Sequence, residues 1–272
     1  MRSDKEIKKR KNHLIARFAR AISYIFDGSV LAAPVFAATS FYNQADSKSV
    51  FPSFITAVIF AAFIPYFLIL FLYKAKKISD LQIARRKERL FPLLIINICV
   101  VAGFFALLYL QPQRLMMSVY SIYLIGLPII SLITLFWKIS FHATYITLFS
   151  MVFMIVFGKW AIFTLTLIPL VGWSRIKLRK HTLPQVIAGI SVIGIISLSV
   201  FYITGFLTTS YWSVNEISYL FKSTSSYLGL VLPGFGACLV FIFLYVFLKE
   251  YIKGKKTSLY YLEKHISFLN DN

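Results

Sequence analysis

Five stretches of this chain are long enough to cross a bilayer and contain no charged side chain. A helix of about 20 apolar residues spans the roughly 30 Å of hydrocarbon in a membrane. Lipid offers no partners to backbone amide groups, so stretches of this kind fold into helices. The sequence therefore predicts an all-α integral membrane protein. The five stretches are residues 51–73, 90–110, 115–137, 182–215 and 223–248.

The overall composition agrees with a membrane location. Hydrophobic residues make up 58% of the 272 positions and charged residues only 14%, whereas soluble proteins average about 45–50% and about 25%. This balance argues against a water-soluble enzyme and against a nucleic-acid-binding protein. The four histidines show no spacing typical of a zinc site, so we expect no metal and no other cofactor.

Three further apolar stretches raise the predicted number of transmembrane helices to eight. Residues 21–42 are apolar apart from Asp27, residues 139–158 end at a glycine, and residues 160–174 form a short span. We expect one polytopic membrane domain over residues 21–248. The chain gives no sign of its oligomeric state.

The net charge of +19 is explained by membrane topology. If both termini are cytoplasmic, 25 of the 29 Lys and Arg residues lie on the cytoplasmic side, as the positive-inside rule requires. We therefore expect a multi-pass protein, typical of a bacterial inner membrane, with a basic cytoplasmic segment at 1–20 and a cytoplasmic tail at 249–272. Residues 1–20 are compatible with an interfacial helix on anionic lipid or with a disordered basic tail.

Three predicted cytoplasmic segments carry the residues of greatest chemical interest. Residues 78–92, 137–142 and 172–189 supply several arginines together with His142 and His181. Ionisable groups at a membrane boundary are costly, so they are the first candidates for function. Two imidazoles and several guanidinium groups suffice for metal-free phosphoryl transfer, in which one imidazole attacks, the other protonates the leaving oxygen, and the cations stabilise the charge.

Two motifs in these segments resemble those of the type 2 phosphatidic acid phosphatase superfamily, which includes lipid phosphatases and, more distantly, vanadium haloperoxidases. The family motif Ser-Arg-x5-His-x3-Asp is matched by Ser174, Arg175 and His181. The family motif Pro-Ser-Gly-His is half matched, because Ser140 and His142 are present without the proline and the glycine.

The remaining family motif, Lys-x6-Arg-Pro, is matched more loosely. Arg89 is followed by Pro92 only after two other residues, and Gln82 stands seven residues before Arg89 in place of the lysine. The resemblance covers residues 78–195, which correspond to the helical core of the family.

The resemblance implies a phosphatidic acid phosphatase-like helical bundle and a metal-independent hydrolase. Its substrate would be a phosphomonoester or diphosphate of a lipid or isoprenoid, cleaved through a phosphohistidine intermediate. His181 would be the nucleophile and His142 the general acid. The residues implied to bind the phosphoryl oxygens are Arg175, Arg89, Ser140 and Ser174.

The largest departure from the family is Gln185, which replaces the aspartate that orients the nucleophilic histidine. Gln185 lies one helical turn after His181, so its oxygen can still accept the Nδ1 proton, but an amide cannot stabilise an imidazolium as a carboxylate does. Asp27 is a candidate to supply the missing carboxylate, and Asp80 and Glu88 are others. The alternative for Asp27 is an ion pair with a basic residue near the helix end.

Several alternatives to catalysis remain open from the sequence. Gln185, Ile139 and Phe141 fit a catalytically impaired relative that acts as a non-enzymatic, anionic-lipid-binding membrane protein. Ser140 also fits an ordinary helix cap. A prenyltransferase is disfavoured because the chain has no DxxxD motif, and a transporter because no inverted repeat is visible.

Overall fold

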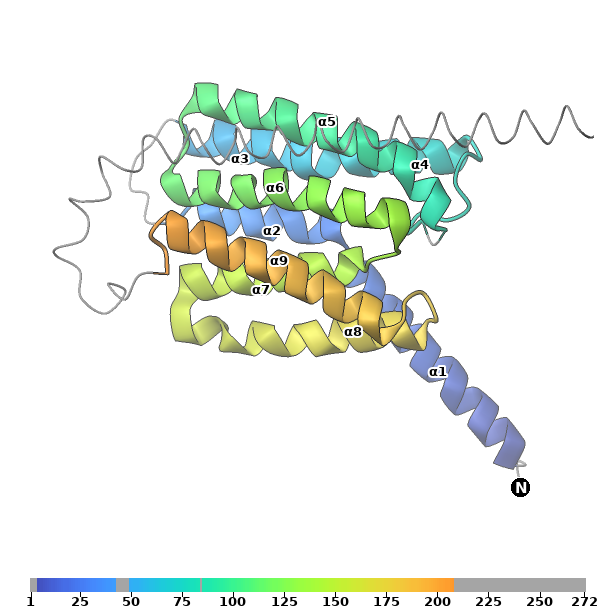
Figure 1. Ribbon diagram of the computed structural model, residues 1–272. Coiled ribbons are helices and arrows are strands. Elements are labelled where there is room, and N and C mark those ends of the chain that lie inside the picture. The colour runs from blue at the N-terminus through green and yellow to red at the C-terminus, as the bar shows by residue number, and fades with distance from the viewer. Residues whose placement is uncertain (1–3, 43–48, 84, 208–272) are drawn as a thin grey trace, which may run out of the picture.

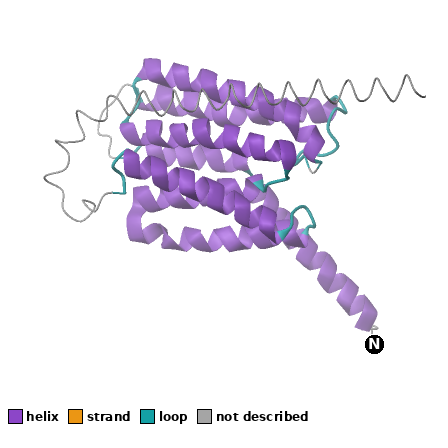
Figure 2. Ribbon diagram, in the orientation of Figure 1, coloured by secondary structure: helices purple, strands orange, loops and turns teal. Residues whose placement is uncertain are grey.

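The computed structural model describes residues 4–42, 49–83 and 85–207, and within these ranges every regular element is a helix (Figures 1 and 2). The elements are α1 (Asp4–Ile25), α2 (Gly28–Ser40), α3 (Val50–Val58), the π-helix η1 (Ile59–Phe63), α4 (Ile64–Lys74), α5 (Arg86–Leu110), α6 (Arg114–Phe136), α7 (Phe141–Phe157), the 3-10 helix η2 (Gly158–Thr166), α8 (Leu167–Lys177) and α9 (Leu183–Ile203).

Five helical stretches in the described residues are long and apolar enough to cross a membrane, or six if the bent pair α1 and α2 forms one span. The sequence predicts eight spans. The last of these, residues 223–248, lies outside the described residues, so the count of eight stays a prediction. The five stretches are Val50–Lys74, Arg86–Leu110, Arg114–Phe136, Phe141–Lys177 and Leu183–Ile203.

The predicted span 21–42 is broken in the structure. Helix α1 ends at Ile25 and α2 begins at Gly28, with a bend of 45° between them. Asp27 causes the break because it is the N-cap of α2: its Oδ1 accepts a hydrogen bond from the Ser29 amide at 3.1 Å. An N-cap residue has an extended backbone, which ends the preceding helix.

The stretch Phe141–Lys177 turns back on itself, so that α7 and α8 run side by side in opposite directions (Figure 1). The reversal occurs at Gly158, whose φ of +58° lies in the left-handed region. Residues with a Cβ rarely adopt this conformation. The sequence-based division into 139–158 and 160–174 agrees with this reversal. No loop separates the helices there, because α7, η2 and α8 follow one another directly in the chain.

Helix α6 is the most deeply buried element and lies between α5 and α9 (Figure 1). Its neighbours α5 and α9 also expose large apolar side chains on their outer faces, and α7 packs against both α2 and α9. The bundle therefore has α6 and α7 near its centre, and α7 carries one of the two candidate histidines at its first turn.

The loops that carry the candidate residues all lie at one end of the bundle, beside α1 (Figure 1). Lys180 Nζ donates to Asp80 Oδ2 at 3.2 Å, and the Ser140 amide donates to the Gln185 carbonyl at 3.2 Å. These contacts join the segments 78–92, 137–142 and 172–189, which are far apart in the sequence. The alternating directions of the helices are what bring them together.

Candidate functional site

His181 lies in the short connection between α8 and α9, with only 6% of its surface exposed. Its Nδ1 is 3.2 Å from Gln185 Oε1, and this same oxygen accepts the Thr182 amide at 3.2 Å. Because an amide hydrogen already points at Oε1, the group facing His181 is an acceptor, and Nδ1 must carry the imidazole proton. The lone pair of the neutral ring is then on Nε2.

The Nε2 atom of His181 is buried and has no hydrogen-bond partner among the described residues. Burial, followed by the positive charges of Arg89, Lys138 and Arg175, lowers the pKa of His181 to about 3. The imidazole is therefore neutral at physiological pH. A neutral imidazole with a free lone pair has the form that a nucleophile requires.

Arg175 lies in the last turn of α8 and is completely buried. Its NH1 group donates to the Ser23 hydroxyl of α1 and to Gln82 Oε1, the latter at 2.8 Å. Its Nε atom has no partner within the described part of the chain. Among the described residues the guanidinium thus retains an unused donor, and its NH1 contacts come from α1 and from the α4–α5 connection.

Arg89 lies in the first turn of α5 and is also buried. Its Nε donates to the Ile83 carbonyl at 2.7 Å and its NH1 to the Ile139 carbonyl at 3.1 Å. The guanidinium carbon lies 5.4 Å from the centre of the Phe141 ring. These bonds fix the cation between the α4–α5 and α6–α7 connections.

His142 contacts the carboxylate of Asp27. Its Nε2 lies 3.4 Å from Asp27 Oδ2 and 3.1 Å from the Ser23 carbonyl oxygen. Both neighbours are acceptors, so Nε2 carries a proton. Asp27 thus contacts the candidate general acid, whereas Gln185 contacts His181. The other two acidic candidates have partners elsewhere: Asp80 pairs with Lys180, and Glu88 with Arg85 and Ser79.

The two candidate serines bond within their own helices. Ser140 is the N-cap of α7, and its Oγ accepts from the Ala143 amide at 3.4 Å. Ser174 Oγ donates to the Val171 carbonyl at 2.8 Å. Both serines are buried, and both lie within a few residues of a candidate histidine in the sequence. Their observed hydrogen bonds are those of local helix structure.

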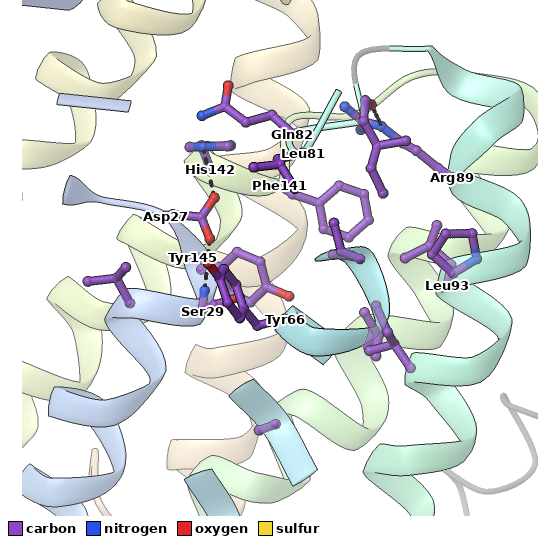
Figure 3. A pocket seen from close by; sticks show the side chains of 18 of the residues that line it. Asp27, Ser29, Tyr66, Leu81, Gln82, Arg89, Leu93, Phe141, His142 and Tyr145 are labelled. Atoms are coloured by element: carbon purple, nitrogen blue, oxygen red, sulfur yellow. Dashed lines mark hydrogen bonds and ion pairs between the residues drawn. The ribbon is translucent and has the colours of Figure 1, made fainter. Parts of the chain in front are cut away.

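A cavity of about 350 Å³ adjoins these residues (Figure 3). Asp27, Gln82, Arg89 and His142 form its polar side, and mostly apolar and aromatic residues from α1, α2, η1, α4, the α4–α5 connection, α5, α6 and α7 form the rest. His181 is not part of this lining. Gln82, which contacts Arg175, stands at the boundary between the cavity and the buried arginine.

Three residues of this site were not among the sequence-based candidates: Ser23, Gln82 and Lys138. Gln82 has a sequence signal, since it occupies the lysine position of the loosely matched motif. Lys138 is indistinguishable in sequence from the other cations that set membrane topology. Nothing in the sequence marks Ser23, which reaches the site only because α1 packs against α8.

Comparisons with protein-family models, with curated proteins and with solved structures found no match. Residues 4–42, 49–83 and 85–207 contain no group of three or more His, Cys, Asp or Glu side chains placed to hold a metal ion. The chemistry of the site must therefore be argued from its own geometry.

Proposed function

We propose that this protein is a membrane-embedded hydrolase that removes phosphate from a lipid or isoprenoid phosphomonoester or diphosphate at the cytoplasmic leaflet. The observation that carries the proposal is the buried, neutral His181, whose Nε2 has no partner among the described residues and lies in the field of Arg89, Lys138 and Arg175. A cluster of cations attracts a phosphoryl group, and an imidazole lone pair beside it is a nucleophile for phosphorus.

In the first step, His181 Nε2 forms a bond to phosphorus while the bond from phosphorus to the leaving oxygen breaks. His142, protonated on both ring nitrogens for this step, gives its Nδ1 proton to that oxygen, so the lipid leaves as a neutral alcohol or as a protonated phosphate. Arg175 and Arg89 donate to the phosphoryl oxygens. Gln185 keeps the proton on Nδ1 of His181, which directs the attack to Nε2.

In the second step, water attacks the phosphohistidine and His142 accepts a proton from that water. The bond from phosphorus to Nε2 breaks, inorganic phosphate leaves, and His181 returns to its neutral form. Asp27 acts in both half-reactions, because its carboxylate contacts the proton-bearing Nε2 of His142 and stabilises the doubly protonated ring that donates in the first step and forms in the second. Two histidines with separate partners thus divide the nucleophilic and proton-transfer roles.

The cavity supports an amphiphilic substrate. Most of its lining is apolar, while its polar side carries His142 and Arg89 (Figure 3). A substrate with an apolar chain and a phosphate head matches this division, because burying the chain is favourable and the head meets charged donors.

The test is phosphate release by purified protein in detergent micelles. Phosphatidate, phosphatidylglycerophosphate and a polyprenyl diphosphate are the substrates. We expect His181→Ala to abolish release and His142→Ala to reduce it by about 100-fold or more. His13→Ala, which changes an exposed histidine of α1, is the matched control and should retain full activity. Full activity in both site variants would overturn the proposal.

A second candidate function is favoured by the departure at Gln185. A neutral amide beside His181 fits a protein that binds an anionic lipid head group at Arg175 and Arg89 without turning it over. Binding of phosphatidate-containing vesicles, lost in Arg175→Gln, together with no phosphate release from any of the three substrates, would select this function.

A further inference from the structure

Lys138 lies in the connection between α6 and α7 and contacts the segment that carries His181. Its Nζ donates to the carbonyl of Lys180 at 2.6 Å, and Lys180 directly precedes His181 in the chain. The same connection is tied to α9, because the Ser140 amide donates to the Gln185 carbonyl. The hydrogen bond to the Lys180 carbonyl thus holds the ammonium group beside His181. The bond between Ser140 and Gln185 keeps the two connections together.

The charges around Lys138 are mostly of its own sign. Arg89 from α5, Arg175 from α8 and Lys180 from the α8–α9 connection face it, against the single carboxylate of Asp80. Burial and then these like charges lower the pKa of Lys138 to about 8. Cations held together at a half-buried point repel one another, and an anion placed between them removes that repulsion.

We propose that Lys138 is a third phosphate-binding cation, which acts with Arg89 and Arg175 on the phosphoryl group at His181. This inference rests on the proposed function, because it places that group at His181 Nε2. An ammonium group has three hydrogens, and the Lys180 carbonyl takes one of them. Two remain to donate to phosphoryl oxygens.

Lys177 provides a comparison within the same end of the bundle. Both lysines count as cytoplasmic cations under the positive-inside rule, but Lys177 is exposed on the last turn of α8, whereas Lys138 is half-buried and lies beside His181. Location in the fold, rather than charge alone, therefore separates a binding cation from a topological one.

The experiment measures inorganic phosphate binding to the purified full chain by isothermal titration calorimetry at pH 7, together with the KM for phosphatidate. We expect Lys138→Gln to weaken phosphate binding about tenfold or more, since a charged hydrogen bond is lost. Lys138→Arg should stay within about threefold of the wild type, because the charge is kept. Lys177→Gln should equal the wild type.

A pH series provides a readout that a merely structural lysine would not change. The probe is sulfate, whose charge is constant over this range. Wild-type affinity should fall as the pH rises through about 8, where Lys138 loses its proton. Lys138→Arg should hold its affinity to about pH 10, because arginine stays charged. Lys138→Gln should bind weakly at every pH.

The outcomes separate this inference from the proposed function. If the wild type releases phosphate and Lys138→Gln matches it in phosphate affinity and in KM, the role of Lys138 is overturned and the phosphatase stands. If no substrate is hydrolysed but Lys138→Gln still loses phosphate affinity, the phosphatase is overturned and the anion site stands. Thermal unfolding of each variant identifies any loss of folding. If Lys138→Gln does not fold, the pH profile of sulfate binding by Lys138→Arg decides whether Lys138 binds the anion.

Discussion

The substitution Gln185→Glu tests how the amide beside His181 limits this site. Glutamate has nearly the same length as glutamine, so its carboxylate falls at the position of Oε1, 3.2 Å from Nδ1 of His181. It also preserves the capping box with Thr182, since glutamate is as favourable as glutamine at this position of a helix. The change therefore adds a negative charge with little change in geometry.

The expected effect follows from the distance between these two groups. An opposite charge this close raises the pKa of a histidine by about one to three pH units. Starting from about 3, the pKa of His181 remains below 7, so the nucleophile stays neutral at physiological pH. Each pH unit corresponds to about 1.4 kcal/mol of stabilisation of the positively charged ring, and positive charge develops on that ring as Nε2 bonds to phosphorus. We expect kcat to rise about tenfold or more.

The assay combines phosphate release with NMR titration of the His181 ring. Gln185→Met is the matched control, because it keeps the length and removes the acceptor. It should lower kcat, because no acceptor then keeps the imidazole proton on Nδ1. In serine proteases, the corresponding change of tautomer lowers kcat about 10⁴-fold. A raised pKa of His181 in Gln185→Glu without any gain in kcat would refute the assignment of His181 as the attacking group.

Three further changes have definite expected outcomes. Asp27→Asn should reduce hydrolysis of phosphatidate about tenfold or more and hydrolysis of p-nitrophenyl phosphate by a smaller factor, because the p-nitrophenol leaving group needs no proton from His142 and only the second step then depends on Asp27; equal losses on both substrates would contradict this. Gly189→Ala should lower thermal stability by about 1–3 kcal/mol, because its Cβ would lie 2.7 Å from the carbonyl oxygen at the α7 N-cap, whereas Gly194→Ala meets nothing within 4 Å and should be neutral or stabilising. Thermal stability in detergent should fall as the pH drops from about 6.5 toward about 3. In this range His181 binds a proton in the unfolded chain, where its pKa is ordinary, but not in the folded protein, where its pKa is lowered. The substitution His181→Gln should flatten this pH dependence.

The apolar spans were the part of the fold most accessible from sequence. The predicted spans 90–110 and 115–137 correspond to Arg86–Leu110 and Arg114–Phe136, and differ from them by a few residues at most. A long uncharged stretch of this kind is stable in lipid as a helix, so its composition is sufficient to predict its secondary structure and its approximate ends. The break at Asp27 was missed because mean hydropathy does not register a single capping side chain.

The partners of the candidate residues were less accessible. Asp27 and His142 are 115 positions apart and meet only because α2 packs against α7. The pairing of Gln185 with His181 was accessible, because the two residues are only four positions apart in the sequence. Contacts set by local geometry can thus be read from spacing, whereas those set by the packing of distant helices cannot.

The contacts of Arg175 with Ser23 and Gln82 have a consequence for turnover. In the proposed reaction, a phosphoryl group must compete with these internal acceptors for the same guanidinium group, so its measured affinity is a difference between two sets of bonds. The same competition acts on the product, because the protein's own oxygens are ready to replace those of inorganic phosphate. The resting contacts of α1 and of the α4–α5 connection would then weaken inhibition by product and shorten the time before the next substrate binds.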